Sequence, residues 1–298
     1  MNHSATELVP LDDTGFPPDA FHVSYRRVSA ALRQHVSALV GVEVRIKGPI
    51  PLAVAPHDSL PLIAQFGCGT DPIEEKAEHG LNTSLTGIRN NTGAFLGAGN
   101  CVTLFAMLTP LGAVHLLDSR PLAKAPRIKA EVAGLLDRSV TRALESDLAL
   151  ARGLDTKLDR FADWLERRAA RQRRQSTAAL RAARAAKRLA EEPAAAMETL
   201  AAEQHVSRRQ LDRDFALWIG TSAGHFAQVT RLQNVSRRAY RGGTLADIAA
   251  DAGFADQAHM SRVVRKLTGL TPTRFLRSSG TPMVSAFRAA TGGTTVYL

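Results

Sequence analysis

Apolar and polar positions follow a strand-like pattern over residues 17–107. Residues 42–46 alternate with a period of two, and other short apolar runs are bounded by Pro and Gly. The strands predicted from these runs cover residues 42–46, 52–54, 60–66, 85–88, 94–96 and 102–108. Residues 23–39 are interpreted as a helix that precedes the sheet. Many short strands at close spacing are typical of a small barrel or sandwich.

Residues 93–117 contain no charged side chain and would be long enough to span a bilayer. Several glycines, Pro110 and His115 interrupt this segment, so a continuous apolar helix is not expected. The segment is instead predicted to form buried strands that run into a short helix.

The apolar spacing becomes helical near Pro126. Apolar residues recur every three or four positions at Ile128, Val132, Leu135, Leu136, Val140, Leu144 and Leu148, and again at Leu154, Leu158, Phe161 and Leu165. The two predicted helices could pack on the barrel, on each other or on a second subunit, and the pattern does not separate these choices. A polar stretch at residues 169–174 is interpreted as a hinge between two halves of the chain.

The C-terminal half contains an internal repeat. Residues 200–203 match residues 248–251, and after a turn the match continues with one added residue in the second copy. Each copy has a cap, a set of apolar positions and a terminal glycine. The corresponding residues are Ser207 and Asp256, Leu211 and Met260, Arg213 and Arg262, Phe215 and Val264, Trp218 and Leu267, Gly220 and Gly269, and Phe226 and Phe275.

Each copy of the repeat predicts a helix-turn-helix. Ser207 can cap the second helix of the first copy, with Gln210 completing a capping box, and Gly220 and Gly269 can end the second helices. Residues 222–241 join the copies and would form a helix roughly 30 Å long. Because successive major grooves on one face of DNA lie about 34 Å apart, one chain could place two helices in adjacent grooves. The alternative is a helical bundle whose repeat is a coincidence. It would not explain why the N-cap, the turn, the buried apolar positions and the terminal glycine all recur together.

Charge is distributed unevenly along the 298 residues. Residues 1–151 hold 13 Lys and Arg against 15 Asp and Glu, whereas residues 152–298 hold 25 against 13. The excess positive charge of the C-terminal half favours a polyanionic partner such as nucleic acid. A membrane surface is disfavoured, because the basic run at residues 167–188 is Ala-rich and lacks aromatic residues.

The repeat resembles the DNA-binding domain of AraC/XylS-type bacterial transcription regulators. The second copy carries the resemblance through residues 245–257, 261–262 and 268–272, and the first copy through Leu200, Ala201, residues 207–211, Arg213, Phe215, Gly220, Arg231 and Leu232. The resemblance covers residues 176–278. The chain departs from the family pattern at four positions. Met260 and Val264 stand where the family usually has aromatic residues, and His205 and Ala223 replace a common Gly and a common Pro.

The resemblance implies which side chains face DNA. In the first recognition helix these are Arg209, Asp212 and Arg213, with Arg208 near the phosphates; in the second they are Gln257, Ala258, His259 and Arg262. Arg can bridge guanine, Gln can pair with adenine and Asp can accept from cytosine. Alternatives remain: Arg213 and Arg262 could pair with Asp214 or Asp256, Asp212 could orient Arg208 or Arg209, and His259 could touch a phosphate.

The residues do not indicate a catalytic or metal site. His57, His79 and His115 lack the local spacing of a metal-dependent cupin, and no base accompanies Cys68. Cys68 is interpreted as structural, with redox sensing as the alternative. Gly97-Ala98-Gly99 lacks the third glycine of a dinucleotide site. No metal and no cofactor are therefore predicted. An enzyme that acts on a metabolite and carries a DNA-binding appendage remains the alternative to a regulator.

The predicted fold is a multidomain α+β protein. A β-rich domain at residues 1–125, which resembles the cupin-like sensor domains that precede this DNA-binding unit in many family members, precedes a helical dimerisation or linker segment at 126–175. An all-α double helix-turn-helix domain at 176–280 and a loosely held tail at 281–298 follow. The predicted function is a sequence-specific transcription regulator controlled by a small-molecule effector bound in the N-terminal domain. Its predicted partners are double-stranded DNA, this effector, a second copy of the chain and, for an activator, RNA polymerase. With two cysteines and no signal-peptide pattern, the chain is expected to be a soluble cytoplasmic protein.

Overall fold

The computed structural model describes residues 21–45, 49–66, 82–98, 101–117, 121–122, 130–131, 136, 138–171, 175–239 and 242–278. Its strands are β1 (Phe21–Arg26), β2 (Val36–Val44), β3 (Pro49–Val54), β4 (Leu60–Phe66), β5 (Asn82–Leu85), β6 (Gly93–Ala98), β7 (Cys101–Leu108) and β8 (Ala130–Glu131). Its helices are α1 (Pro110–Leu116), α3 (Arg138–Leu150), α4 (Leu154–Ala169), α5 (Thr177–Glu191), α6 (Met197–Glu203), α7 (Arg208–Ile219), α8 (Ala223–Ala239), α9 (Leu245–Asp251), α10 (Gln257–Thr268) and α11 (Pro272–Ser278).

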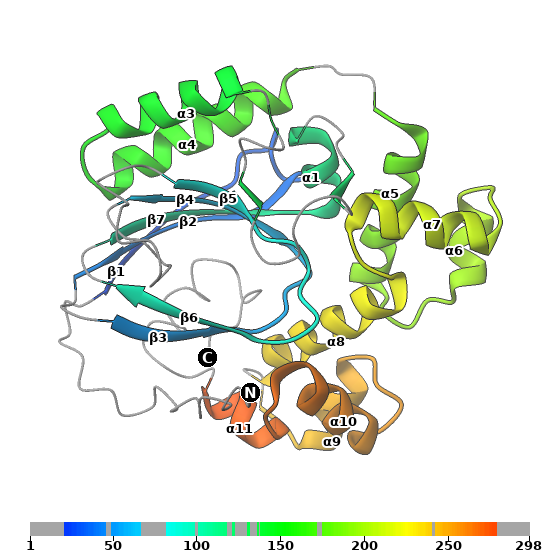
Figure 1. The fold of residues 1–298 in the computed structure, drawn as a ribbon. Coiled ribbons are helices and arrows are strands. Elements are labelled where there is room, and N and C mark those ends of the chain that lie inside the picture. Colours follow the sequence, from blue (N-terminus) through cyan, green and yellow to red (C-terminus); the bar gives the residue numbers. More distant parts are fainter. Residues whose placement is uncertain are drawn as a thin grey trace, which may run out of the picture.

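The N-terminal half is built on antiparallel sheet. Six strands pair in the order β1-β2-β7-β4-β5-β8, and β3 pairs with β6 in a separate ribbon that lies opposite the larger sheet (Figure 1). No pairing between described strands joins the two sheets. The predicted β-rich domain is therefore confirmed, in an open arrangement rather than a closed barrel.

Two local predictions in this half are wrong. Residues 23–39 form β1, a turn and the start of β2 instead of a helix, because Val23 pairs with Val42 and Tyr25 with Val40. The helix predicted from Ile128 begins only at Arg138, and Ala130–Glu131 pair with β5 as an edge strand. Ile128, Val132 and Leu135 lie outside the described residues. The prediction for residues 93–117 is confirmed as β6, β7 and the short helix α1.

Helix α4 covers one face of the larger sheet and α3 lies beside α4 (Figure 1). The four apolar positions predicted to share a face of α4 are all buried: Leu154, Leu158, Phe161 and Leu165. Gly41 of β2 allows this close packing, since a Cβ there would lie 2.7 Å from the Leu154 side chain. Two of the open alternatives thus occur together, because α4 packs on the sheet and α3 packs on α4.

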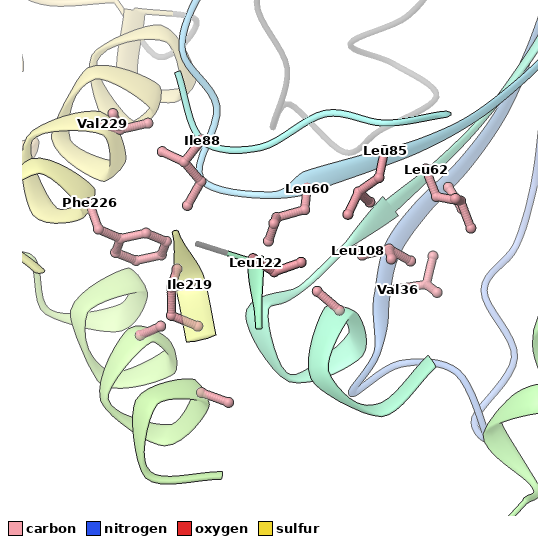
Figure 2. Packing of buried hydrophobic residues seen from close by; sticks show 14 of the residues in the cluster. Val36, Leu60, Leu62, Leu85, Ile88, Leu108, Leu122, Ile219, Phe226 and Val229 are labelled. Atoms are coloured by element: carbon pink, nitrogen blue, oxygen red, sulfur yellow. The ribbon is translucent and has the colours of Figure 1, made fainter. Parts of the chain in front are cut away.

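One continuous apolar core joins the two halves of the chain. Figure 2 shows Leu60, Ile88 and Leu122 of the N-terminal half facing Ile219, Phe226 and Val229 of the C-terminal half. All six side chains are largely or fully buried. The connecting helix α8 therefore belongs to the hydrophobic core of the whole molecule as well as to the helical domain.

Cys101 is buried and free, and Cys68, the tail at 281–298 and residues 172–174 of the predicted hinge lie outside the described residues. In the part of the chain that is described, no helix has the length and apolar character needed to cross a membrane.

Candidate nucleic-acid interface

The first helix-turn-helix consists of α6 and α7. Ser207 begins α7 as its N-cap, and its hydroxyl accepts a hydrogen bond from the Gln210 backbone N–H at 3.2 Å. The side chain of Gln210 does not close the predicted capping box; it donates to Asp214 Oδ1 at 2.7 Å. The inward positions Leu211, Phe215 and Trp218 are buried as the repeat predicts.

The second helix-turn-helix repeats these lengths and caps with α9 and α10. The first helices of both copies have seven residues and the recognition helices have twelve. Asp256 Oδ1 accepts from the His259 backbone N–H at 2.6 Å, and Thr244 and Asp247 form a reciprocal capping box at the start of α9. Met260 and Val264 are fully buried, so the departures from aromatic residues leave these positions filled.

The turns of both copies have the same hydrogen bonds. In the first copy Val206 N–H donates to Ala201 O at 3.1 Å, and in the second Phe254 N–H donates to Ala249 O at 2.9 Å. This pairing is the Schellman motif, which needs a left-handed residue just before the apolar one. Gly253 takes that conformation with φ +85° in the second copy, whereas His205 takes it with φ +55° in the first. The internal repeat therefore extends to the backbone.

Helix α8 joins the two units and contacts both. Its 17 residues correspond to a length of about 25 Å. Arg231 on α8 donates through Nη2 to Pro193 O at 2.6 Å, just before α6, and its guanidinium lies 6.0 Å from the centre of the Phe254 ring in the second unit. One side chain on the connecting helix thus contacts both the segment that precedes α6 and the turn of the second unit.

The side chains predicted to face DNA in the first recognition helix are exposed: Arg208, Arg209, Asp212 and Arg213. Arg208 forms ion pairs with Glu198 and, at 3.7 Å, with Asp212. This contact favours the alternative in which Asp212 orients Arg208. Arg213 does not pair with Asp214, because Asp214 is buried and binds Arg181 of α5 through Nη2 at 2.7 Å.

In the second recognition helix Gln257, Ala258 and Arg262 are exposed and His259 is half-buried. The His259 ring packs edge-on against Phe254 with ring centres 5.4 Å apart. Asp256 acts as the cap of α10, and no ion pair of Arg262 occurs among the described residues. The structure thus brings the predicted residues to the exposed N-terminal parts of α7 and α10, while their contact with DNA stays a prediction.

The N-terminal half contacts α8 and the far end of α10, which the sequence did not indicate. Gln233 Nε2 donates to Pro56 O at 2.7 Å, and His225 Nε2 lies 2.8 Å from Arg89 O. The Thr92 backbone N–H donates to Leu267 O, close to the end of α10, at 2.9 Å. These partners are far apart in sequence, so no local pattern could reveal them. They leave the N-terminal turn of α10, where the predicted DNA-facing residues begin, outside the contact.

No group of three or more His, Cys, Asp or Glu suited to a metal ion occurs among the described residues.

Comparisons with known proteins identify the C-terminal domain. A family model described as a helix-turn-helix domain matches residues 200–278. No curated protein sequence matches the chain significantly.

The chain is similar in structure to ToxT from Vibrio cholerae O395, with 10% identity, a TM-score of 0.41 and coverage of 88% of this chain and 100% of that chain. A second ToxT structure from this strain, bound to (E)-4-(8-methylnaphthalen-1-yl)but-3-enoic acid, has 10% identity, a TM-score of 0.42 and coverage of 87% and 99%. Wild-type ToxT from strain SCE256, bound to an unsaturated fatty acid, has 12% identity, a TM-score of 0.43 and coverage of 84% and 96%. Structural likeness at this level carries no functional information. The sequence match and the paired geometry instead show that residues 200–278 form an AraC-type helix-turn-helix domain.

Proposed function

We propose that the protein is a transcription regulator that binds specific double-stranded DNA through both helix-turn-helix units and responds to a small-molecule effector. The observation that carries this proposal is the pair of units of equal length, whose predicted base-reading side chains remain exposed while the N-terminal half packs on α8. The connecting helix is about 25 Å long, on the scale of the groove repeat of DNA.

The DNA-facing set in this proposal comprises Arg208, Arg209, Asp212 and Arg213 on α7, and Gln257, Ala258, His259 and Arg262 on α10. Arg209, Arg213 and Arg262 read bases, and Gln257 pairs with adenine. Arg208 lies near the phosphates, and Asp212 orients it through their ion pair.

The proposal is tested by selecting bound duplexes from fragmented genomic DNA with the full-length protein across a salt series. We expect one shared site, made of two short elements about one helical turn apart, and an affinity that falls steeply as salt is added. Salt-sensitive binding without a shared site would contradict specific recognition.

The role of Arg262 is tested with operator variants. Arg262→Ala should cost about 1–3 kcal/mol of binding free energy and relax specificity at one base position. Arg27→Ala, which removes an exposed arginine of the N-terminal half, is the matched control and should bind like the parent. If Arg262→Ala discriminated among all variants as the parent does, the assignment of Arg262 would be wrong.

Three further parts of the proposal concern domains and partners. The sensor covers residues 1–125, the helical segment 126–175 and the DNA-binding domain 176–280. The packing of α5 on α7 supports a DNA-binding domain that begins near residue 176, whereas β8 extends the sheet past residue 125.

A second copy binds through α3 and α4, where Leu150 is 84% exposed, so Leu150→Glu should lower the mass measured by sedimentation. If the protein activates transcription, RNA polymerase contacts the half-buried positions of α8 such as Gln228 and Arg238.

A further inference from the structure

We propose that a small organic anion with a compact apolar body binds in a cleft between the two halves of the chain and competes there with Asp58 for Arg237. The inference rests on the proposed function, since it assigns the effector a place and a chemical class. The cleft has a volume of about 350 Å³, within the range of ligand sites. Its lining comes from the N-terminal half, from α5 and from the end of α8, and its charged members are Arg33, Asp58, Lys187 and Arg237.

The charges around the cleft favour an anion. Arg33, Lys187 and Arg237 carry positive charge into the lining, against the single carboxylate of Asp58. Arg33 is exposed and forms no ion pair with any described residue, and Lys187 reaches Glu191 only at 3.9 Å across two exposed side chains. Two positive charges of the lining are therefore not strongly neutralised.

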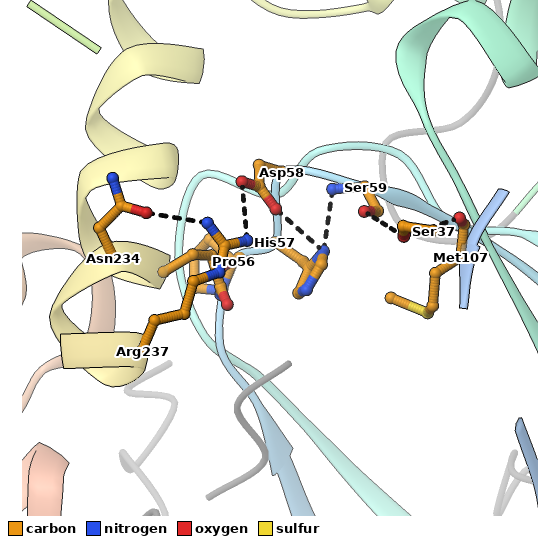
Figure 3. Close-up of polar contacts among 9 residues, drawn as sticks. Ser37, Pro56, His57, Asp58, Ser59, Met107, Asn234 and Arg237 are labelled. Atoms are coloured by element: carbon orange, nitrogen blue, oxygen red, sulfur yellow. Dashed lines mark hydrogen bonds and ion pairs between the residues drawn. The ribbon is translucent and has the colours of Figure 1, made fainter. Parts of the chain in front are cut away.

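Arg237 and Asp58 connect α8 to the segment that precedes β4 (Figure 3). Arg237 Nη2 lies 3.3 Å from Asp58 Oδ2, and Nη1 donates to Asn234 Oδ1 at 2.8 Å. The Nε–H of Arg237 is buried and has no partner among the described residues. The contacts with Asp58 and Asn234 therefore leave part of the hydrogen-bonding capacity of this guanidinium unsatisfied.

His57 does not compete with Arg237 for the Asp58 carboxylate as a cation. The Ser59 backbone N–H donates to His57 Nδ1 at 2.8 Å, so Nδ1 acts as an acceptor and carries no proton. The 3.5 Å contact between His57 Nδ1 and Asp58 is consequently not an ion pair. Among the described residues Arg237 is thus the one cationic partner of Asp58, which is only 8% exposed.

The rest of the lining suits an apolar body. Pro110 and Leu111 from the start of α1 face the cleft together with Ala183 and Ala190 of α5. The hydroxyl of Ser37 donates to Met107 O at 3.1 Å and lies 3.5 Å from the hydroxyl of Ser59, so a polar edge borders the apolar wall (Figure 3). Apolar and cationic walls in one cleft match a ligand with an apolar body and an anionic head.

Occupation of this cleft would act on the DNA-binding domain through α8. Arg237 lies in the last turn of α8, which leads to α9 and α10. An anion that takes Arg237 from Asp58 replaces one of the polar contacts between this end of α8 and the N-terminal half. The effector thereby alters the support of the second helix-turn-helix unit.

The test is calorimetric titration of the full-length protein, without DNA, using cyclohexanecarboxylate as the probe. We expect saturable binding by this carboxylate and much weaker binding by cyclohexylmethanol, which lacks the charge, and by inorganic phosphate, which lacks the apolar body. Arg33→Gln and Lys187→Gln should each weaken binding about five- to tenfold, and Arg184→Gln, an exposed control on α5 outside the cleft, should leave binding unchanged.

Asp58→Asn should change the affinity for the carboxylate in the opposite direction to Arg33→Gln and Lys187→Gln, and it tests whether Asp58 competes with the ligand for Arg237. Removing the competing carboxylate should tighten binding several-fold, whereas Arg237→Gln should weaken it. Absence of saturable binding, equal binding of the alcohol, or no gain in Asp58→Asn would overturn the proposal. Because no DNA is present, failure here leaves the DNA-binding function standing, and loss of specific DNA binding with intact carboxylate binding would refute only the proposed function.

Discussion

The ion pair between Asp214 and Arg181 should determine whether the first helix-turn-helix stays attached to α5. Asp214 is 3% exposed and accepts from Arg181 Nε at 3.0 Å, Arg181 Nη2 at 2.7 Å and Gln210 Nε2 at 2.7 Å. Replacing Arg181 by Met keeps most of the apolar stem but removes the cation. The buried carboxylate would then retain only Gln210 as a donor.

The expected cost follows from burial. Removing one partner of a buried ion pair typically costs about 3–5 kcal/mol, because the other charge remains desolvated and unpaired. The Arg181 side chain is 19% exposed and Gln210 still donates, so we expect Arg181→Met to lower the free energy of unfolding by about 2–4 kcal/mol. Asp214→Leu should cost less, since Arg181 can turn to water. The double variant should lie within about 1 kcal/mol of the parent.

The assay is urea unfolding followed by tryptophan fluorescence. The chain has two tryptophans, Trp164 in α4 and Trp218 in α7, so Trp218 reports on the first recognition helix once Trp164 is replaced by Phe in every protein compared. The four proteins of the cycle then give the coupling between Arg181 and Asp214.

Two results would refute this reasoning. One is an Arg181→Met variant that loses less than about 1 kcal/mol, which would mean that water solvates Asp214 in its absence. The other is an additive double variant, which would mean that the two side chains stabilise the domain independently.

Three further predictions concern backbone and protonation. His205→Gly should raise the free energy of unfolding by about 1 kcal/mol, and Gly253→Ala should lower it by a similar amount, because both positions have positive φ; equal thermal midpoints for parent and variants would contradict this. Gly112→Ala should cost about 2–3 kcal/mol in urea unfolding, since its Cβ would lie 1.9 Å from His35 O; a loss below about 0.5 kcal/mol would show that the turn can move freely. Burial is the larger cause that lowers the pKa of His35 below 6.5, and the nearby His115 is the smaller one. Because His35 binds a proton more readily in the unfolded chain, its protonation favours unfolding. Stability should therefore fall as pH drops through about 6.5, and His35→Gln should flatten that part of the pH profile; an unchanged slope would exclude His35 as the cause.

The internal repeat was predictable because its signals are local. Ser207, Asp256, Gly220 and Gly269 mark the ends of α7 and α10, and these caps depend on neighbours a few residues away. The capping box predicted for Ser207 failed for a tertiary reason, since Gln210 bonds Asp214.

Long-range contacts were not predictable from the same signals. The apolar spacing in residues 23–39 fits a helix, yet pairing with β2 residues 39–44 holds β1 as a strand. Gln233 and Pro56 are 177 residues apart in the sequence, so only the folded arrangement brings them together. In the candidate interface Arg209, Arg213 and Arg262 are exposed, while base contacts depend on DNA geometry that no sequence pattern of this chain contains.

The shared apolar core also limits how this chain can be divided or recombined. A fragment cut before α5 would present Ile219, Phe226 and Val229 to water, where they now face Leu60, Ile88 and Leu122. A chimaera would need a foreign sensor with apolar side chains in matching places. Substitutions on the two sides of this core must therefore compensate one another, so the two halves would diversify jointly rather than as exchangeable modules.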